Sequence, residues 1–380
     1  MIAKLGEVCT IVSGSTPKTS VTSYWDGNIK WITPAELNED TFYIMDSVRH
    51  ITEEGKEKTG LSYLPTGTVI LSSRAPIGKT AIAGCEMCCN QGFKNLICSD
   101  AIYNEYLYFF LKSKTDYLNS LGRGATFKEV SKSIVENIEI PLPEVNQQKE
   151  IAEKFKKLEQ LISLRKQQLA KLDELVKARF VEMFGDPVVN SKRWPVETIE
   201  NHIDLLTGFP FDSSGYVSKG INICGGLIIM PQKIDWNACK YWPQVTGYED
   251  YILRPNDIVI ALDRPWISNG FKISMVDKEH LPALLIQRTA RIRVVDINQH
   301  YLMQSLLLGR FDKHCNITGS LVPHISPKDI KSYSIMIPPI ELQNQFAAFV
   351  EHVDQQKQTV QQSLEKLELM KKALMQEYFG

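Results

Sequence analysis

The chain has 380 residues, of which 43% are hydrophobic and 23% charged, a composition typical of a folded protein with room for two domains. Its 43 lysines and arginines are balanced by 44 acidic residues, which argues against a protein that binds nucleic acid without specificity through an overall basic surface. No stretch approaches the roughly 18 to 20 apolar residues of a membrane span, and the first residues lack a signal-peptide pattern, so we expect a cytoplasmic protein.

The first distinctive element is a strand over residues 69–72 followed by the loop Ser73-Arg-Ala-Pro-Ile-Gly-Lys-Thr80. The loop ends like a phosphate-binding loop, but serine stands at the position of the first glycine. The next residues, 81–85, favour a strand rather than the helix that would cap a phosphate. The sequence therefore argues against nucleotide hydrolysis.

A cysteine cluster follows, and its spacing superficially suggests zinc. It lies in apolar, strand-like sequence without a second CxxC or an HxxxH nearby, and the second half has no counterpart. We expect free thiols in a reducing compartment and no metal site. The cluster comprises Cys85, Cys88, Cys89 and Cys98.

A long helix is predicted after a hinge that contains Pro141 and Pro143, and it ends at Gly185. Ten seam positions recur at a mean spacing of 3.5 residues, which is typical of a coiled coil, and the rise of 1.5 Å per residue gives a helix roughly 50 to 60 Å long. The seam positions are Ile151, Phe155, Leu158, Ile162, Arg165, Leu169, Leu172, Val176, Arg179 and Met183.

A second long helix repeats this register when 195 is added to each residue number. Both helices also end alike, in residues 182–185 and 377–380, which indicates that one unit is present twice. The second set of seam positions comprises Phe346, Val350, Val353, Lys357, Val360, Leu364, Leu367, Lys371, Leu374 and Tyr378.

The two seams leave two interpretations open. Each helix can pack on its own globular domain, or the two helices can pair with each other. If the two helices pair antiparallel about their midpoints, no lysine or arginine of one seam faces a lysine or arginine of the other. The long aliphatic stems of these side chains can also extend past an apolar partner. This favours pairing, with Arg165 opposite Leu364, Arg179 opposite Val350, Lys357 opposite Leu172 and Lys371 opposite Leu158.

The duplication extends weakly into the segments before each helix. Residues 69–74 resemble 258–264, with Arg264 as the analogue of Arg74, and residues 122–131 align with 319–326. Asn90-Gln91 takes about the place of Ile286-Gln287. Between these anchors the halves diverge, as expected of two readers of different targets on a shared scaffold.

Motifs for catalysis are missing from the sequence. Gly122-Arg-Gly lacks the third glycine of a dinucleotide fingerprint, and no site for S-adenosylmethionine is evident. Ile337-Pro-Pro-Ile lacks the polar and aromatic members of a tetrapeptide that positions a flipped adenine, and the seven histidines are scattered. We expect a chain without catalytic activity or cofactor of its own.

Together these segments resemble the specificity (S) subunit of type I restriction-modification systems, and the resemblance covers nearly the whole chain. Its loops depart from the usual Gly-Ser-Thr-Phe, with Gly124-Ala-Thr-Phe in the first copy and Leu321-Val-Pro-His in the second. The matching segments in the first half are 71–78, Asn90-Gln91, 106–111, 124–129, 140–143 and the helix led by Gln147 and Gln148.

The resemblance implies an α+β fold with two tandemly repeated target-recognition domains and two long helices that form an antiparallel coiled coil. The implied boundaries are 1–143 for the first target-recognition domain, 144–185 for the central helix, 186–339 for the second domain and 340–380 for the C-terminal helix.

Function and partners follow from the same resemblance. Each domain would read one half of a bipartite, asymmetric double-stranded DNA target, and the helices would set the spacer. Two methylation subunits would dock on the helices, carry S-adenosylmethionine and methylate adenine N6, and restriction subunits can join. No membrane is involved.

Candidate DNA contacts are cations and amides in the loops that carry the repeat anchors, because lysine and arginine bind phosphates while arginine, asparagine and glutamine read base edges. Each is also interpretable as an ordinary surface residue, or as a packing residue for tryptophan. In the first domain they are Arg74, Lys79, Lys94, Arg123, Lys128 and Lys18, with Thr16 and Trp25 as second choices; in the second they are Arg264, Trp266, Asn269, Arg288, Arg291 and His324.

Two other classes of function stay open on the residues alone. A coiled-coil adaptor whose globular halves bind proteins would also have divergent loops on a shared scaffold. An autonomous methyltransferase is disfavoured by the missing motifs. Binding to a particular bipartite duplex that weakens steeply with salt would separate DNA recognition from the adaptor function.

Overall fold

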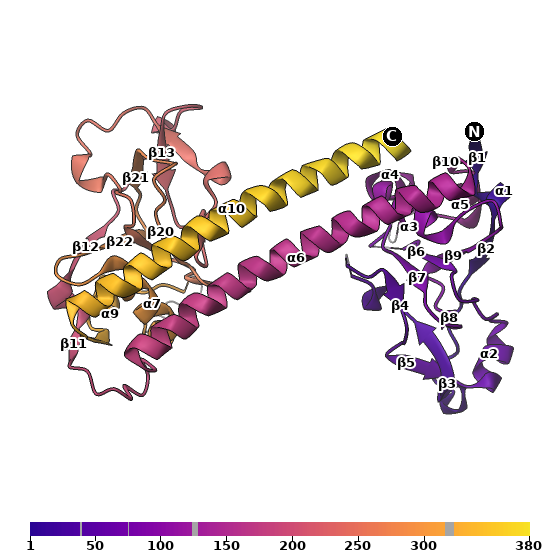
Figure 1. Ribbon diagram of the computed structural model, residues 1–380, viewed down its shortest axis with the longest axis horizontal. Helices are drawn as coiled ribbons and strands as arrows, with labels where there is room; N and C mark the ends of the chain where they lie inside the picture. The colour runs from indigo at the N-terminus through magenta and orange to yellow at the C-terminus, as the bar shows by residue number, and fades with distance from the viewer. Residues whose placement is uncertain (39, 75, 124–127, 316–322) are drawn as a thin grey trace. The chain divides into compact units, whose positions relative to one another are not determined.

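The computed structural model describes residues 1–38, 40–74, 76–123, 128–315 and 323–380. Packing divides the chain into two compact units, each of which combines a globular domain with one end of each long helix (Figure 1). The first unit comprises Met1–Lys166 and Gln362–Gly380, and the second comprises Gln167–Gln361.

The first unit is built on a five-stranded sheet in the order β2-β9-β6-β7-β4, antiparallel except for β4 beside β7. A second sheet has the order β5-β3-β8, and β1 pairs with β10. The strands are β1 (Ile2–Lys4), β2 (Cys9–Ser13), β3 (Trp25–Ile32), β4 (Tyr43–Ile44), β5 (Arg49–Ile51), β6 (Val69–Ser72), β7 (Thr80–Ala83), β8 (Cys88–Cys89), β9 (Phe93–Cys98) and β10 (Glu139–Pro141).

The described residues of the first domain also form five short α-helices. The strands β6 and β7 are buried along their whole length, and α3, which packs on them, is buried from Glu105 to Leu111, so the core lies between this helix and the sheet. The helices are α1 (Leu5–Val8), α2 (Glu53–Thr59), α3 (Asn104–Ser113), α4 (Thr115–Leu121) and α5 (Lys132–Glu136), with 3₁₀ turns η1 (Thr22–Tyr24) and η2 (Pro34–Glu36).

The second unit contains an antiparallel sheet in the order β12-β22-β17-β20 and a three-stranded sheet in the order β16-β13-β21. Three strand pairs complete it: β11 with β23, β14 with β15, and β18 with β19. The strands are β11 (Val196–Thr198), β12 (Ile203–Thr207), β13 (Ile221–Cys224), β14 (Ile229–Met230), β15 (Lys233–Ile234), β16 (Lys240–Trp242), β17 (Ile258–Ala261), β18 (Trp266–Ile267), β19 (Gly270–Phe271), β20 (Ile273–Met275), β21 (Ala283–Leu285), β22 (Thr289–Val294) and β23 (Ser334–Met336).

The helices of the second domain follow the same chain order as α3 to α5 of the first. They are α7 (Gln299–Leu308), α8 (Phe311–His314) and α9 (Pro327–Lys331), and the 3₁₀ turns are η3 (Ile199–His202), η4 (Ser213–Gly215), η5 (Trp236–Ala238) and η6 (Glu249–Tyr251).

A buried glutamine at the start of each long helix shows that the duplication is structural. In the first unit, Gln148 Oε1 accepts a hydrogen bond from the backbone N–H of Tyr103 at 2.8 Å. In the second, Gln343 Oε1 accepts one from Asn298 N at 2.9 Å. Each amide also donates to a proline carbonyl at the start of its helix, at 2.8 and 2.7 Å. Gln343 and Asn298 each lie 195 residues after their counterparts Gln148 and Tyr103 in the first unit. The repeat therefore reaches beyond the long helices.

The long helices are α6 (Val145–Phe184) and α10 (Ile340–Phe379), and within each unit they pack against each other. In the first unit, Phe155 of α6 stacks on Phe379 of α10, with ring centroids 5.6 Å apart. In the second, Phe180 of α6 meets Phe346 of α10 at 5.5 Å. Rising numbers on one helix meet falling numbers on the other, which confirms the antiparallel coiled coil.

The predicted seam is wrong at the C-terminal end of each helix. The buried residues of α6 there are Phe180 and Phe184, not Arg179 and Met183, because both phenylalanines pack on Tyr301 of their domain, at 5.5 and 4.9 Å. On α10 the fully buried residue is Phe379 rather than Tyr378. At these ends, packing on the domain core rather than the heptad spacing decides which helix residues are buried.

The seam lysines lie in the predicted register but have different partners. Lys357 pairs with Asp173 and Lys371 with Glu159 at 2.8 Å, each one residue beyond the predicted leucine. These cations are therefore neutralised by carboxylates rather than extended past leucine.

Candidate nucleic-acid interface

Three charged side chains converge beside the end of β6 in the first unit. Arg74, which follows the strand, donates from Nε to Glu129 Oε2 at 2.9 Å, and Lys94 of β9 donates to Glu129 Oε1 at 3.1 Å. The Lys94 side chain is only 7% exposed, whereas that of Arg74 is 43% exposed. Lys94 thus supports the carboxylate from within, while Arg74 faces outward.

The backbone fixes this arrangement independently of the side chains. Arg123 and Glu129 exchange two hydrogen bonds, at 3.1 and 2.9 Å, and Val130 N donates to Ser73 O at 2.9 Å. The exposed predicted contacts Arg123 and Lys128 are thereby held beside the Arg74 loop. The motif 124–127 between them lies outside the described residues.

Glu129 is ionised at neutral pH. Burial alone would raise its pKa, but the hydrogen bonds from Lys94 and Arg74 outweigh burial and bring the pKa below its ordinary value. A guanidinium has five N–H donors, so the Nε bond to Glu129 leaves the outer edge of Arg74 for a further acceptor. The carboxylate therefore orients the arginine and leaves its outer N–H groups available.

The other predicted residues of the first unit divide by exposure. Lys18 is exposed, but the Lys79 ammonium donates to the carbonyls of Leu37 and Pro34 at 2.6 and 3.3 Å, which ties the loop inward. Trp25 is 8% exposed and packs under Arg49, whose guanidinium lies 3.6 Å from the ring centroid. Thr16 bonds to Gln91. The structure does not bring these residues together with Arg74.

The second unit has the same bridge with different residues. Asp263 and His324 form the backbone bridge that corresponds to Arg74 and Glu129, and Ile325 N donates to Leu262 O at 2.9 Å. The counterpart of Arg74 is therefore Asp263, so the predicted alignment with Arg264 is off by one residue. A single acidic residue now stands where the first unit carries an arginine.

Asp263 is paired with an exposed cation. Its Oδ2 lies 3.2 Å from Arg288 Nε, and the Arg288 side chain is 74% exposed. Arg264, Asn269 and His324 are also exposed on neighbouring loops. They form a polar surface around the carboxylate.

Two predicted residues of the second unit are less accessible. Trp266 is half-buried on β18 and packs against Phe271, with ring centroids 4.8 Å apart. Arg291 is buried on β22 and pairs with Asp204 across the strands. Their side chains belong to the support of the loops rather than to their outer surface.

A glycine at the end of the first strand of each sheet explains how the loops come so close. A Cβ on Gly14 would lie 2.0 Å from the carbonyl oxygen of Asn90, and a Cβ on Gly208 would lie 1.9 Å from that of Ile286. The glycines thus allow two backbone segments to touch, and they confirm the alignment of Asn90 with Ile286. Sequence reasoning missed both glycines, as it missed Glu129 and Asp263.

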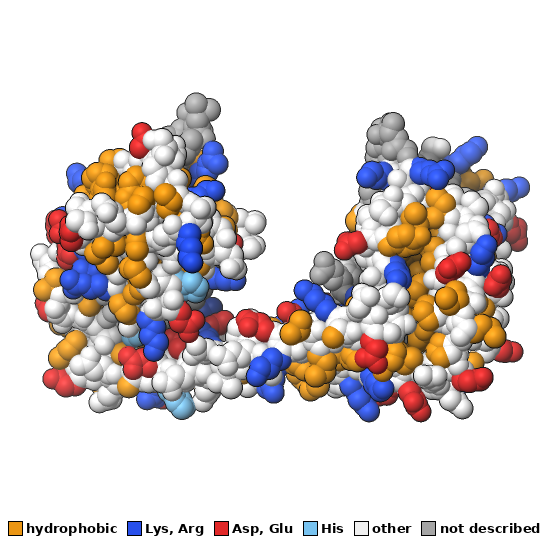
Figure 2. Space-filling view, turned by 90° about the horizontal axis from the view of Figure 1, so that it is seen from above, with side chains coloured by type: hydrophobic (Ala, Val, Ile, Leu, Met, Phe, Trp, Pro, Cys, Tyr) orange, Lys and Arg blue, Asp and Glu red, His pale blue; other side chains and the backbone are white. Residues whose placement is uncertain are grey.

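Charges of both signs mix on the surface. In Figure 2, lysine and arginine side chains are interspersed with aspartate and glutamate on the visible face of each unit, as the near-zero net charge requires. Within the part of the chain that the structure describes, no helix is long and apolar enough to cross a membrane.

Comparison with known proteins identifies the family. The sequence model of the type I restriction modification DNA specificity domain matches residues 1–174 and 241–369. The chain is 28% identical to the type I restriction enzyme MjaIX specificity subunit of Methanocaldococcus jannaschii, over 92% of this chain and 85% of that protein. It is 27% identical to the MjaVIII specificity subunit of the same organism, over 74% and 70%.

A solved structure has the same fold. The crystal structure of a type I restriction-modification system S subunit from M. genitalium superposes with a TM-score of 0.59 at 13% identity, covering 100% of this chain and 96% of that chain. Since the family's sequence model covers most of the residues of both halves, this chain belongs to the type I restriction-modification DNA specificity family.

Proposed function

We propose that this chain is the DNA-specificity subunit of a type I restriction-modification complex, in which each unit reads one half of a bipartite target. The observation that carries the proposal is the repeated backbone bridge beside the strand loop, which presents Arg74 with Glu129 in one unit and Asp263 with His324 in the other. One frame with opposite charges at the same position suits two readers of different sequences.

The chemistry of the two positions indicates different base preferences. An arginine edge matches the O6 and N7 acceptors of guanine in the major groove, whereas an aspartate accepts from the N4 amino group of cytosine. Arg74, with its Nε held by Glu129, would favour guanine. Asp263 would favour cytosine, and the exposed cations Lys18, Arg123, Lys128, Arg264 and Arg288 would bind phosphates.

The long helices would dock the partner subunits. Large apolar side chains on their surfaces are 44% to 68% exposed, as expected of a contact surface for other proteins. We propose that methylation subunits cover them, carry S-adenosylmethionine and perform methyl transfer, so that this chain needs no cofactor. In the first unit these side chains are Leu161, Leu164, Leu369 and Met370, and in the second they are Leu175 and Val181.

The helices would also set the spacer between the half-sites. Two readers on one face of DNA are separated by about one helical turn, roughly 34 Å. A helix of 40 residues, at about 1.5 Å per residue, is long enough for such a spacer. Removing one heptad from α6 and the matching heptad from α10 should change the preferred spacer length.

Methylation by the reconstituted complex tests the reading function. Arg74→Ala should reduce discrimination at one half-site by roughly 5- to 150-fold, the value of one good base contact, while the complex stays assembled. Lys58→Ala, an exposed cation on α2, is the matched control and should change nothing. An assembled Arg74→Ala complex with an unchanged target preference would count against this role.

Binding measurements separate the proposal from an adaptor function. The assembled complex should bind one bipartite duplex over a scrambled duplex, and its affinity should fall steeply with salt because phosphate contacts release counterions. Equal binding to both duplexes would instead favour a protein-binding role for the loops.

A further inference from the structure

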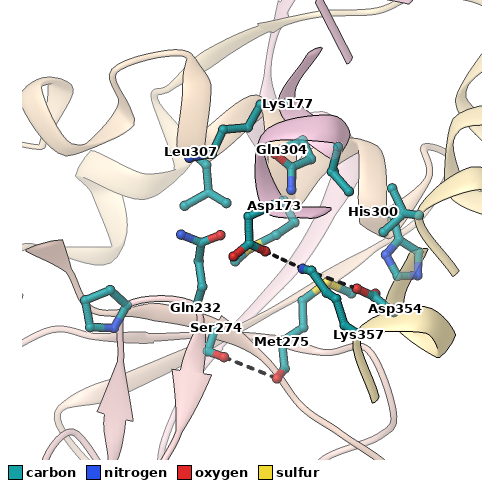
Figure 3. Close-up of a pocket in the computed structure, with 14 residues that line it drawn as sticks. Asp173, Lys177, Gln232, Ser274, Met275, His300, Gln304, Leu307, Asp354 and Lys357 are labelled. Carbon is teal, nitrogen blue, oxygen red and sulfur yellow. Dashed lines mark hydrogen bonds and ion pairs between the residues drawn. The ribbon is translucent and has the colours of Figure 1, made fainter. Parts of the chain in front are cut away.

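A cavity of about 380 Å³ lies within the second unit. It is partly open to solvent and is lined by the C-terminal part of α6, the N-terminal part of α10, α7, the β14–β15 turn and β20 (Figure 3). This volume lies within the range of small-molecule sites. The lining is part apolar, with Val176, Met303 and Val350, and part polar, with Asp173 and Gln304.

The first unit fills the corresponding space with aromatic rings. The offset of 195 residues places Tyr108, Phe109 and Phe155 at the positions of Met303, Gln304 and Val350. Tyr108, Phe109 and Phe155 are fully buried, and the rings of Phe109 and Phe155 stack at 5.1 Å. The fold therefore does not require a cavity here; the second unit has lost the rings that would fill it.

Two cations are missing from the second unit as well. In the first unit, Glu159 is bound by Lys112 at 3.2 Å and by Lys371 at 2.8 Å. The second unit keeps the carboxylate as Asp354, but Leu307 and Val176 stand where these two lysines would be. Among the described residues, Asp354 has one ion pair, and it is longer.

That ion pair is shared between two carboxylates. Lys357 reaches Asp354 at 3.6 Å and also pairs with Asp173, as the dashed lines of Figure 3 show. Lys177 lines the same cavity. The side chains of Asp173 and Asp354 are 50% and 52% exposed, so a ligand at the mouth of the cavity can reach their oxygens, and the formal charges of the lining balance.

Two buried polar atoms at the cavity have no hydrogen-bond partner among the described residues. They are Gln304 Oε1 and His300 Nε2, and His300 is only 9% exposed. Burial lowers the pKa of His300 although Asp354 and Glu351 oppose the shift, so the ring is neutral near pH 7. A side-chain amide oxygen can only accept, and leaving it buried and unpaired is costly.

Figure 3 shows how these groups are placed. Gln304 on α7 and Gln232 from the β14–β15 turn lie on opposite sides of Asp173, and Met275 lies below it. Thioether and aliphatic side chains suit the faces of a flat ring, and amides and carboxylates suit the polar groups on its edge.

We propose that this cavity binds an amino-substituted heteroaromatic ring of the nucleoside class. Such a ring replaces the aromatic rings of the first unit, and its exocyclic N–H donors replace the missing ammonium groups opposite Asp354 and satisfy Gln304 Oε1. Because Lys177 and Lys357 balance Asp173 and Asp354, the lining has no excess positive charge to attract a phosphate, which makes the uncharged nucleoside the better fit. The bridge residues Asp263 and His324 are not among the described residues that line this site.

Titration of the purified full chain with nucleosides tests the proposal by calorimetry or ligand-observed NMR. Adenosine should bind at least about tenfold more tightly than inosine, and cytidine than uridine, because each pair exchanges an amino donor for a carbonyl acceptor. Adenosine monophosphate and a single-stranded oligonucleotide rich in adenine serve as further probes; preference for either would assign the site to nucleotides or to a DNA base instead of a free nucleoside.

Matched variants locate the binding. Gln304→Phe restores the residue of the first unit and should abolish adenosine binding, and Val350→Phe should do the same from α10 if the first variant fails to fold. Gln355→Phe, at an exposed position on α10, should leave binding unchanged. DNA target preference should be unaffected in all three variants, which separates this proposal from the reading function. Adenosine binding that survives both cavity variants, or no discrimination between amino and carbonyl nucleosides, would overturn it.

Discussion

The two units share a backbone frame and differ in the side chains that the frame presents. The hydrogen bond from a buried tyrosine to a strand carbonyl recurs at 2.8 Å in both units, from Tyr106 to Pro141 and from Tyr301 to Met336. At the bridge beside the strand loop, by contrast, Arg74 in one unit stands where Asp263 stands in the other. Bonds to backbone atoms tolerate almost any change in neighbouring side chains, so such a scaffold can keep its fold while its recognition surface changes.

The largest effect should come from filling the glycine contacts that both units share. Gly14→Val and Gly208→Val place carbon atoms against a backbone oxygen that cannot move aside, and each should lower the free energy of unfolding by about 4 kcal/mol. Chemical denaturation measures the loss. Gly226→Ala, whose new Cβ would meet its neighbours at 3.6 Å or more, is the control and should cost under about 1 kcal/mol. If either valine variant were as stable as the parent, the glycine contacts of the two units would not be structurally equivalent.

Removing the buried glutamines should cost slightly less. Gln148→Ala leaves one backbone N–H and the carbonyls of Ala101 and Pro143 without this partner, whereas Gln343→Ala leaves one N–H and one carbonyl. We expect about 3 kcal/mol for each in denaturant unfolding, with the larger loss at Gln148. The exposed neighbours provide controls: Gln147→Ala and Gln345→Ala should stay within about 0.5 kcal/mol of the parent. A clearly larger loss at Gln343 than at Gln148 would contradict these hydrogen bonds.

The charged bridge should distinguish the units. Glu129→Gln leaves Lys94 buried without its anion and should cost about 2 kcal/mol, whereas Asp263→Asn removes a pair with an exposed arginine and should cost under about 1 kcal/mol. Thermal or chemical unfolding at pH 7 measures both changes. Equal costs would mean that the two carboxylates have the same structural role.

The acid dependence of stability offers a second measure of Glu129. Its pKa is lower in the folded chain than the ordinary value of 4.5, so its contribution is present above pH 4.5 and is lost as the pH falls through the folded-state pKa. The parent should therefore lose more stability than Glu129→Gln on acidification below about pH 5. Parallel pH profiles for the two proteins would contradict the assigned ion pairs.

The smallest effect is expected in the coiled coil. Lys371→Ala removes one of two lysines on Glu159 and should cost about 1 kcal/mol, while Lys357→Ala removes a more accessible ion pair and should cost about 0.5 kcal/mol. Unfolding in low and high salt checks both values, because screening should reduce them. A larger loss at Lys357 would indicate that its two carboxylates repel each other strongly.

Periodicity made the helices predictable from the sequence, whereas the loops offered no comparable signal. The 3.5-residue spacing fixed the antiparallel register to within one residue, but it failed at Arg179 and Met183 because Phe180 and Phe184 bury into the domain core. The counterpart of Arg74 was misplaced by one residue since loop sequences carry no repeat that sets register. The cavity was invisible because it arises from lost volume at Gln304 and Val350, which only the folded neighbours reveal.

The assignment of Phe379 to the first unit has a consequence for the order in which the chain folds during synthesis. This residue is 1% exposed and packs on Tyr106 and Phe155, so the N-terminal domain completes its core only after residues 362–380 have left the ribosome. The second unit comprises residues 167–361 and can close first. The half that is translated first is therefore the half that matures last, and a nascent chain would carry it with an incomplete core until residues 362–380 have been made.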